Sequence, residues 1–220
     1  LDPASAAAKA KMKYDTDNDG TLDLNEVKAA AGATFDKLDR DHVRSYLNYY
    51  LGLYAGAAGS GMVGKRGVRY MLTDSYEAAA SNWTDRMIAE FTARRGYDPR
   101  PWLPALTGRV VESAGASDRF LWDFRRTLSD LISDNHYAEL SRLLHARGLG
   151  RYGESHEVRR AFIGDGMEVK KSADIPMGAT WYGRANGLVL PDIRESAAVA
   201  HLYGQNLVAA ESFTTVGGIA

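Results

Sequence analysis

The feature that most constrains the fold is an alternation of short apolar runs with longer amphipathic stretches, which begins near residue 68. Apolar runs of this length, bounded by turn residues, predict buried strands, and the stretches with a 3.6-residue period predict helices. Strands that alternate with helices favour a parallel sheet with right-handed crossovers. The sequence therefore predicts an α/β fold, with strands at residues 68–72, 149–153, 177–181 and 206–210 and helices at residues 43–54, 84–95, 117–145 and 192–203. Loops are predicted at the glycine-rich residues 56–67 and at Pro99, Pro101 and Pro104.

Composition narrows the class of protein. The chain has 220 residues, of which 45% are hydrophobic, so it can bury a sizeable core in one or two domains. The formal net charge is -1, and basic residues form no extended cluster, which argues against nucleic acid or an anionic membrane as partner. No cysteine is present, which excludes disulfides, and no apolar run reaches the length of a membrane span. A signal peptide is not visible at the start of the chain.

Acidic residues come directly after the predicted strands. Asp74 and Glu77 follow the first strand, Glu154 follows the second, and Glu211 follows the last. In a (β/α)8 barrel, the carboxyl ends of the strands build the active site. A glycoside hydrolase needs two carboxyl groups there, one to protonate the leaving oxygen and one to activate water or attack the sugar. The alternative is that these acids are solvated loop residues or helix caps.

A calcium-binding motif precedes this pattern. Residues 15–26 match every position of the EF-hand loop, including Gly20 at the sharp turn. Calcium binds through six to eight oxygen atoms, and the loop offers them at the expected spacing. The alternative is an acidic turn that binds no metal. The predicted Ca²⁺ ligands are Asp15, Asp17, Asp19, Thr21, Asp23 and Glu26.

A second EF-hand loop begins at residue 35 and breaks off after Asp41, because Val43 and Arg44 stand where a carboxylate and a glycine are needed. Composition also changes at this point, from alanine, lysine and acids to an aromatic helical stretch. We therefore expect two units: an EF-hand segment over residues 1–41, with one complete loop and one truncated loop, and a glycosidase-like domain over residues 42–220.

The second unit resembles glycoside hydrolase family 106, the α-L-rhamnosidases. The similarity begins at residues 70–77, Tyr-Met-Leu-Thr-Asp-Ser-Tyr-Glu, and continues in the same order to residue 213. It is therefore more specific than any single short motif. The other matching segments are residues 82–85, 94–98, 102–109, 117–124, 152–154, 173–178 and 201–213.

The resemblance implies a (β/α)8 catalytic domain, of which roughly half is present, that removes terminal α-L-rhamnose from a glycan with inversion and with calcium dependence. By position, Glu77 resembles the general acid and Glu211 the base, with Glu154 as a third candidate, and the division of the acid and base roles among the three stays open. Asp74, Asn82, Trp83 and Trp181 are the implied sugar-binding residues, and His156 and Gln205 are weaker candidates. It also implies an extracellular or periplasmic location. The unpaired edges of an incomplete sheet allow self-association.

Other motifs do not support a competing function. Residues 59–64 satisfy the pattern GxGxxG, but Arg66 stands where a P-loop needs serine or threonine, and a strand rather than a helix follows. The five histidines show no zinc-binding spacing. Three hypotheses remain: a rhamnosidase fragment with a calcium-binding segment, a calcium-binding protein whose barrel remnant is inactive, or a fusion of two fragments without a coherent function.

Overall fold

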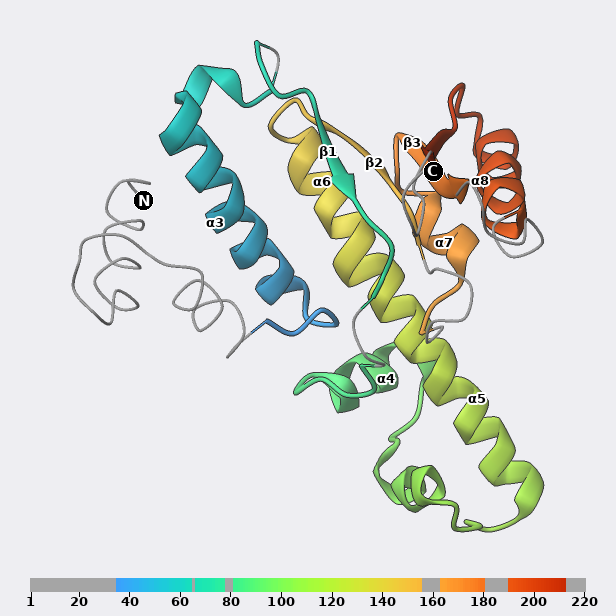
Figure 1. The fold of residues 1–220 in the computed structure, drawn as a ribbon. Coiled ribbons are helices and arrows are strands. Elements are labelled where there is room, and N and C mark those ends of the chain that lie inside the picture. Colours follow the sequence, from blue (N-terminus) through green and yellow to red (C-terminus); the bar gives the residue numbers. More distant parts are fainter. Residues whose placement is uncertain (1–34, 65, 78–80, 156–162, 181–189, 213–220) are drawn as a thin grey trace, which may run out of the picture.

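The computed structural model describes residues 35–64, 66–77, 81–155, 163–180 and 190–212 (Figure 1). Within these residues, four strands form one sheet: β1 Tyr70–Thr73, β2 Gly150–Gly153, β3 Ile175–Thr180 and β4 Ala209–Ser212. The α-helices are α3 Arg40–Ala58, α4 Met87–Arg95, α5 Ala114–Leu131, α6 Glu139–His145, α7 Gly166–Lys170 and α8 Leu190–Tyr203. Two 3₁₀ segments, η1 Ser60–Met62 and η2 Arg100–Thr107, and one π segment, η3 Ile132–Ala138, complete the described elements.

The sheet is parallel throughout and keeps the order β1-β2-β3-β4. Tyr70 pairs with Gly150 at one end of β1, and Thr73 pairs with Gly153 at the other. Helix α6 packs against β2 and α8 packs against β3 (Figure 1). This curled parallel sheet is compatible with half of a (β/α)8 barrel, so the predicted α/β class is confirmed. The complete loop of the predicted EF-hand, residues 15–26, lies outside the described residues, whereas residues 35–41 of the truncated loop are described.

The predicted long helix exists as one continuous run from α5 through η3 to α6. It begins where the Ser113 side chain accepts a hydrogen bond from the amide of Ala116. In the π segment in the middle of the run, backbone hydrogen bonds join residues five apart instead of four, so each turn holds more residues. The 3.6-residue pattern of the sequence does not reveal this departure. The run crosses the molecule beside the sheet and links its two hydrophobic clusters (Figure 1).

In the part of the chain that the structure describes, the core consists of two clusters of buried side chains. The first surrounds α4, α5 and η3 and includes Phe91 and Phe120, whose ring centroids are 5.8 Å apart. The second lies between α3 and α6. Each cluster uses apolar positions that recur at helical spacing, which is why the helices were predictable from the sequence. The buried members of the second cluster are Val43, Leu47, Leu51, Leu140, Leu143, Leu144 and Leu149.

Three predictions of local structure are wrong. The proline-rich stretch is the 3₁₀ segment η2 rather than a loop, because proline at its first turns has the required φ and needs no amide donor there. The predicted glycine-rich loop begins later than expected, since α3 continues to Ala58. The last strand is displaced toward the C-terminus, so Glu211 lies inside β4 rather than after it.

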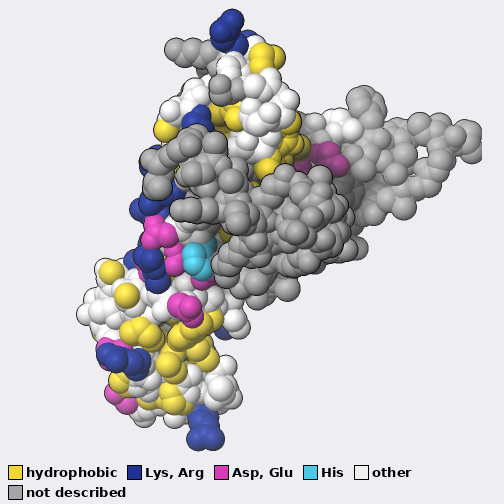
Figure 2. All heavy atoms as spheres, turned by 90° about the vertical axis from the view of Figure 1, so that its left-hand side faces the viewer, with side chains coloured by type: hydrophobic (Ala, Val, Ile, Leu, Met, Phe, Trp, Pro, Cys, Tyr) yellow, Lys and Arg dark blue, Asp and Glu magenta, His cyan; other side chains and the backbone are white. Residues whose placement is uncertain are grey.

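Residues of the truncated second loop take part in capping and ion pairing. The Asp39 side chain accepts hydrogen bonds from the amides of Asp41 and His42 and caps α3. Arg86 reaches both Asp39, at 2.8 Å, and Asp41, at 2.7 Å. Acidic and basic side chains are interspersed on the described part of the face in Figure 2. Within the described ranges, no helix is long and apolar enough to cross a membrane.

Candidate active site

The structure brings together three of the predicted acidic residues at the carboxyl ends of the strands. Asp74 follows the last residue of β1, Glu154 follows the last residue of β2, and Glu211 lies within β4. One carboxylate oxygen of each residue lies within 4.8 Å of the others. We call these three residues the carboxylate triad. Their exposure differs, since Asp74 is exposed, Glu211 is intermediate and Glu154 is buried.

Backbone pairing fixes the first two members of the triad. The amide of Glu154 donates to the carbonyl of Thr73 at 3.0 Å, which continues the ladder between β1 and β2 past their last residues. Gly153 permits this close approach, because a Cβ atom at that position would lie 1.9 Å from the Thr73 hydroxyl oxygen. The parallel register therefore places Asp74 and Glu154 side by side.

Glu154 is an unusual buried acid. Its side chain is 6% exposed, and its Oε1 atom has no hydrogen-bond partner among the described residues. Burial, and after it the neighbouring charges of Asp74 and Glu211, together raise the pKa of the Glu154 carboxyl to about 7. The ammonium of Lys170 acts in the opposite direction. Glu154 is therefore partly protonated at neutral pH unless a cation compensates its charge.

The donor set of the triad fits a hard cation. Three carboxylates at this spacing repel one another, and either a bound proton or a bound metal ion relieves the repulsion. Calcium and magnesium prefer carboxylate oxygens. The unpartnered Oε1 atom of Glu154 also fits such a ligand, because a buried polar atom is stable only when something binds it.

Glu77 is not a member of the triad. It is exposed, and its carboxylate accepts a hydrogen bond from the Ser75 hydroxyl at 3.0 Å. The segment that carries it lies beside Glu154, because the amide of Tyr76 donates to the carbonyl of Ser155 at 2.7 Å. Glu77 therefore belongs to the same edge of the sheet as the triad.

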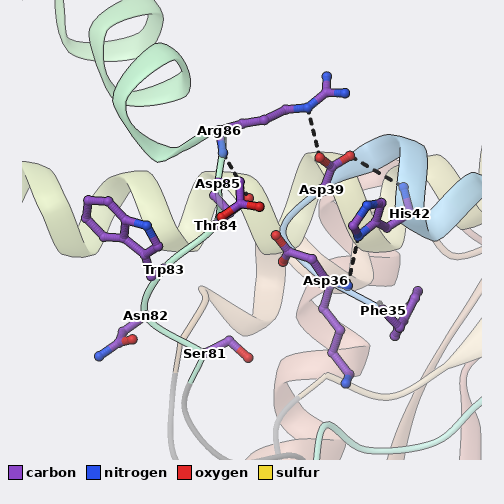
Figure 3. Close-up of a pocket in the computed structure, with 11 residues that line it drawn as sticks. Phe35, Asp36, Asp39, His42, Ser81, Asn82, Trp83, Thr84, Asp85 and Arg86 are labelled. Atoms are coloured by element: carbon purple, nitrogen blue, oxygen red, sulfur yellow. Dashed lines mark hydrogen bonds and ion pairs between the residues drawn. The ribbon is translucent and has the colours of Figure 1, made fainter. Parts of the chain in front are cut away.

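Asn82 and Trp83 line a separate open pocket of about 670 Å³, shown in Figure 3. Its opposite wall is the segment around Asp36 and Asp39 at the start of α3. The Tyr76 hydroxyl lies 3.2 Å from the hydroxyl of Ser81, which also lines this pocket. The predicted sugar-binding residues are therefore divided between the triad, which includes Asp74, and this pocket.

Three other predicted residues have different outcomes. Trp181 and His156 lie outside the described residues, as do the six predicted calcium ligands of residues 15–26. Gln205 donates from its side-chain amide to the carbonyl of Ala173 at 2.7 Å. It therefore joins α8 to the chain before β3, which is a structural contact.

Two buried cations near the triad were missed in the sequence. Lys170, 1% exposed, forms an ion pair with Glu195 at 2.9 Å, and Glu195 accepts a hydrogen bond from the Ser155 hydroxyl at 3.2 Å. Arg151 is fully buried in β2, and its guanidinium donates to hydroxyl groups. A four-residue strand is too short for a period to reveal its buried face. The hydroxyl acceptors of Arg151 belong to Thr73, Ser141 and Ser172.

Comparison with known proteins identifies the family. The sequence profile of glycoside hydrolase family 106, described as alpha-L-rhamnosidase, matches residues 17–219. The chain belongs to this family. The match includes all three members of the triad together with Glu77, and it begins inside the predicted calcium loop. The resemblance inferred from the short sequence segments is thereby confirmed.

Two relatives of this family-106 chain are much longer proteins. A solved structure of a rhamnosidase from Novosphingobium sp. PP1Y is 52% identical, with a TM-score of 0.77, and the match covers 81% of this chain and 17% of that one. A curated protein of Formosa agariphila, described as "Putative beta-glucuronidase", is 42% identical over 151 residues. That match covers 69% of this chain and 12% of the relative. The chain thus spans less than a fifth of either relative.

Proposed function

We propose that this chain supplies the catalytic carboxyl groups of an enzyme that hydrolyses terminal α-L-rhamnosides. The observation that carries the proposal is the triad: three carboxylates meet at the carboxyl edge of a parallel sheet in a member of glycoside hydrolase family 106. The substrate is a rhamnose-containing glycan or glycoside. An extracellular or periplasmic location is the one in which such polymeric substrates are met.

The spacing of the triad guides the assignment of roles. Inverting glycosidases separate their acid and base by about 6.5–9.5 Å to leave room for water. The triad oxygens lie within 4.8 Å of one another, so an inverting pair needs one partner from outside the triad. In this proposal, Glu77 outside the triad protonates the leaving oxygen, and Glu211 within it activates the water. This assignment makes the proposed reaction an inverting one and follows the roles that the family resemblance implies.

Asp74 and Glu154 then hold a proton or a cation beside the sugar. When bound, Ca²⁺ would compensate the triad and polarise sugar hydroxyl groups by charge. Asp74 and Glu154 supply oxygen ligands for it, while Asn82 and Trp83 contact the glycan. A second Ca²⁺ ion binds the EF-hand loop through Asp15, Asp17, Asp19, Thr21, Asp23 and Glu26. Substitution Glu26→Gln should weaken calcium binding at that loop, and unchanged binding would contradict this part of the proposal.

The sheet edges support a further proposal about assembly. Tyr70 and Leu72 on β1 are 47% and 45% exposed, although both are large apolar residues at the edge of the sheet that the described residues form. Exposed edge strands pair with other chains unless something covers them. Copies of this chain therefore associate with one another through β1 at high concentration, which sedimentation can measure.

The test is hydrolysis of two α-L-rhamnosides in excess calcium, one with a dinitrophenyl leaving group and one with a poorer alkyl leaving group. Glu211→Gln should abolish hydrolysis of both substrates, because water is no longer activated. Glu77→Gln should abolish hydrolysis of the alkyl rhamnoside only, because the dinitrophenyl group leaves without protonation. NMR of the first product should show the inverted anomer.

The matched control is Glu168→Gln, which changes an acid on α7 that pairs with Lys171. It should leave both rates within about twofold. Equal rates for the parent chain and Glu211→Gln would remove Glu211 from the chemistry. If neither the parent chain nor Glu211→Gln hydrolyses the substrates, the alternative of a calcium-binding chain with an inactive barrel segment is favoured.

A further inference from the structure

The pocket of Figure 3 has the lining of a carbohydrate site. It is formed by residues 35–42, at the start of α3, and residues 81–86, before α4, which face each other across it. Its volume of about 670 Å³ lies within the range of roughly 300–1,000 Å³ that small-molecule sites occupy. Two aromatic side chains, Phe35 and Trp83, are accompanied by hydroxyl, amide, imidazole and carboxylate groups, which can exchange hydrogen bonds with sugar hydroxyls.

Trp83 provides the apolar surface. Its ring stacks on Phe124, with centroids 6.4 Å apart and an angle of 27° between the planes, so the core holds the indole in place. The residue nevertheless remains 44% exposed. A large aromatic surface that is fixed on one side and open on the other is suited to binding the apolar face of a sugar ring.

The charges of the pocket favour a neutral ligand. Arg86 is already bound to Asp39 and Asp41, and Lys37 lies 5.2 Å from the centre of the Phe35 ring. Asp36 and Asp85 also line the pocket, so among the described lining residues three carboxylates stand beside two cations. An anionic sugar would meet like charges there, whereas neutral hydroxyl groups can donate to the same carboxylates.

Hydrogen bonds connect the pocket to the triad. Ser155, next to Glu154, accepts from the amide of Tyr76, and the hydroxyl of Tyr76 lies 3.2 Å from that of Ser81 at the pocket wall. A single tyrosine therefore bridges the two sites. The pocket wall thus lies one tyrosine side chain away from the residue that follows Glu154.

We infer that the pocket between residues 35–42 and 81–86 is a second sugar subsite, which binds a neutral glycosyl unit next to the terminal sugar. This inference rests on the proposed function, because it requires that the terminal sugar occupy the triad. It assigns Trp83 the role of a stacking platform and Asp36 and Asp85 the role of hydroxyl acceptors. It also predicts discrimination against a uronic acid at this position.

The experiment is calorimetric titration of the chain carrying Glu211→Gln with two disaccharides, α-L-rhamnosyl-D-glucose and α-L-rhamnosyl-D-glucuronic acid of the same linkage. The neutral disaccharide should bind about tenfold more tightly than the acidic one and than free L-rhamnose. Adding Trp83→Ala should remove about tenfold of the affinity for the neutral disaccharide, and Trp83→Phe should restore part of it.

The matched control is Trp122→Ala, which removes a more exposed tryptophan, at 63%, that is not among the residues lining the pocket. It should leave the affinity unchanged. Near-ultraviolet circular dichroism checks that each variant is folded. Equal affinity for the two disaccharides, no binding of either, or equal losses from Trp83→Ala and Trp122→Ala would overturn the inference. Binding as expected without hydrolysis by the parent chain would contradict the proposed function and leave the subsite standing.

Discussion

Glu139 and Glu154 are shielded from water to nearly the same extent, with 3% and 6% exposed, but their surroundings are opposite. Glu139 accepts hydrogen bonds from Arg142, at 2.6 and 2.8 Å, and from Arg44 at 3.1 Å. Glu154 faces two further acids. Hydrogen bonds from Arg142 are the main reason that the pKa of Glu139 is lowered, whereas burial raises the pKa of Glu154 to about 7.

The difference teaches how to separate a structural acid from a functional one. Burial of a carboxyl group is compatible with either role, but a structural acid is paired with cations that offset its desolvation. An acid that is buried beside like charges destabilises the fold at neutral pH, and such an arrangement is typical of sites that bind protons, metal ions or substrates. By this criterion Glu139 stabilises the fold, and Glu154 belongs to the site.

The largest expected effect tests whether a buried cation with a full set of hydrogen bonds holds the scaffold of the triad. Arg151→Met should lower the free energy of unfolding by about 3–5 kcal/mol, because the hydroxyls of Thr73, Ser141 and Ser172 lose their buried donor. Urea denaturation measures the loss. Arg125→Met, on the exposed face of α5, is the control and should stay within about 0.5 kcal/mol. Similar costs for the two variants would contradict this assignment.

The next largest effect is the pH dependence of the free energy of unfolding that Glu154 causes. Its folded pKa of about 7 exceeds the ordinary value of 4.5, so between these values the folded state holds a proton that the unfolded state has lost. The associated stabilisation is fully present below about pH 4.5 and disappears as the pH rises through 7. The free energy of unfolding should therefore fall by up to about 3 kcal/mol across that window.

Glu154→Gln should remove this slope, since the amide does not titrate. The measurement is the difference in unfolding free energy between the parent chain and Glu154→Gln in calcium-free buffers from pH 4 to pH 9. A difference that is constant over the whole range would show that Glu154 titrates alike in the folded and unfolded states.

Glu139→Gln should change the free energy of unfolding in the direction opposite to Glu154→Gln. It removes the charge that Arg44 and Arg142 bind, so the free energy of unfolding at pH 7 should fall by about 1–3 kcal/mol. Because the pKa of Glu139 is lowered in the folded state, its stabilisation is present above the ordinary pKa and is lost as the pH falls through the folded one. Chemical denaturation of the Glu139→Gln and Glu154→Gln chains at pH 7 compares the sites directly. A greater loss from Glu154→Gln would reverse the comparison.

The smallest expected effect concerns calcium at the triad. In a Glu26→Gln background, which weakens the predicted EF-hand loop, millimolar Ca²⁺ at pH 8 should raise the free energy of unfolding by about 1–2 kcal/mol through binding to the folded state. Adding Glu154→Gln should abolish this gain, and adding Glu168→Gln should preserve it. A gain that survives Glu154→Gln would place the ion elsewhere.

The sequence predicted those parts of the molecule that depend on pattern. The apolar periodicity located α4, the long helical run and α8, and short apolar runs located the strands to within a few residues. The acids after β1 and β2 could be assigned to one edge because parallel strands share their carboxyl ends. Glu211 was placed after its strand rather than within it, because strand boundaries depend on pairing with Met177 to Thr180 of β3.

Other features arise from tertiary contacts that no local pattern records. Helix α7 has five residues, too few to show a period, and is stabilised by the Asp165 cap. The burial of Lys170 depends on Glu195 and Ser196, which are more than twenty residues away. The second wall of the Trp83 pocket comes from the start of α3, in a stretch whose acids resembled a truncated calcium loop.

The most direct test of the central claim, that three carboxylates share one site, is the pKa of Glu154 in calcium-free buffer, followed by NMR of its side-chain carboxyl carbon. The account predicts a midpoint of about 7 in the parent chain and a lower midpoint in Glu211→Gln, because one repelling charge is removed. An ordinary midpoint near 4.5 in both chains would contradict the account, since Glu154 would then be neither desolvated nor close to the other acids.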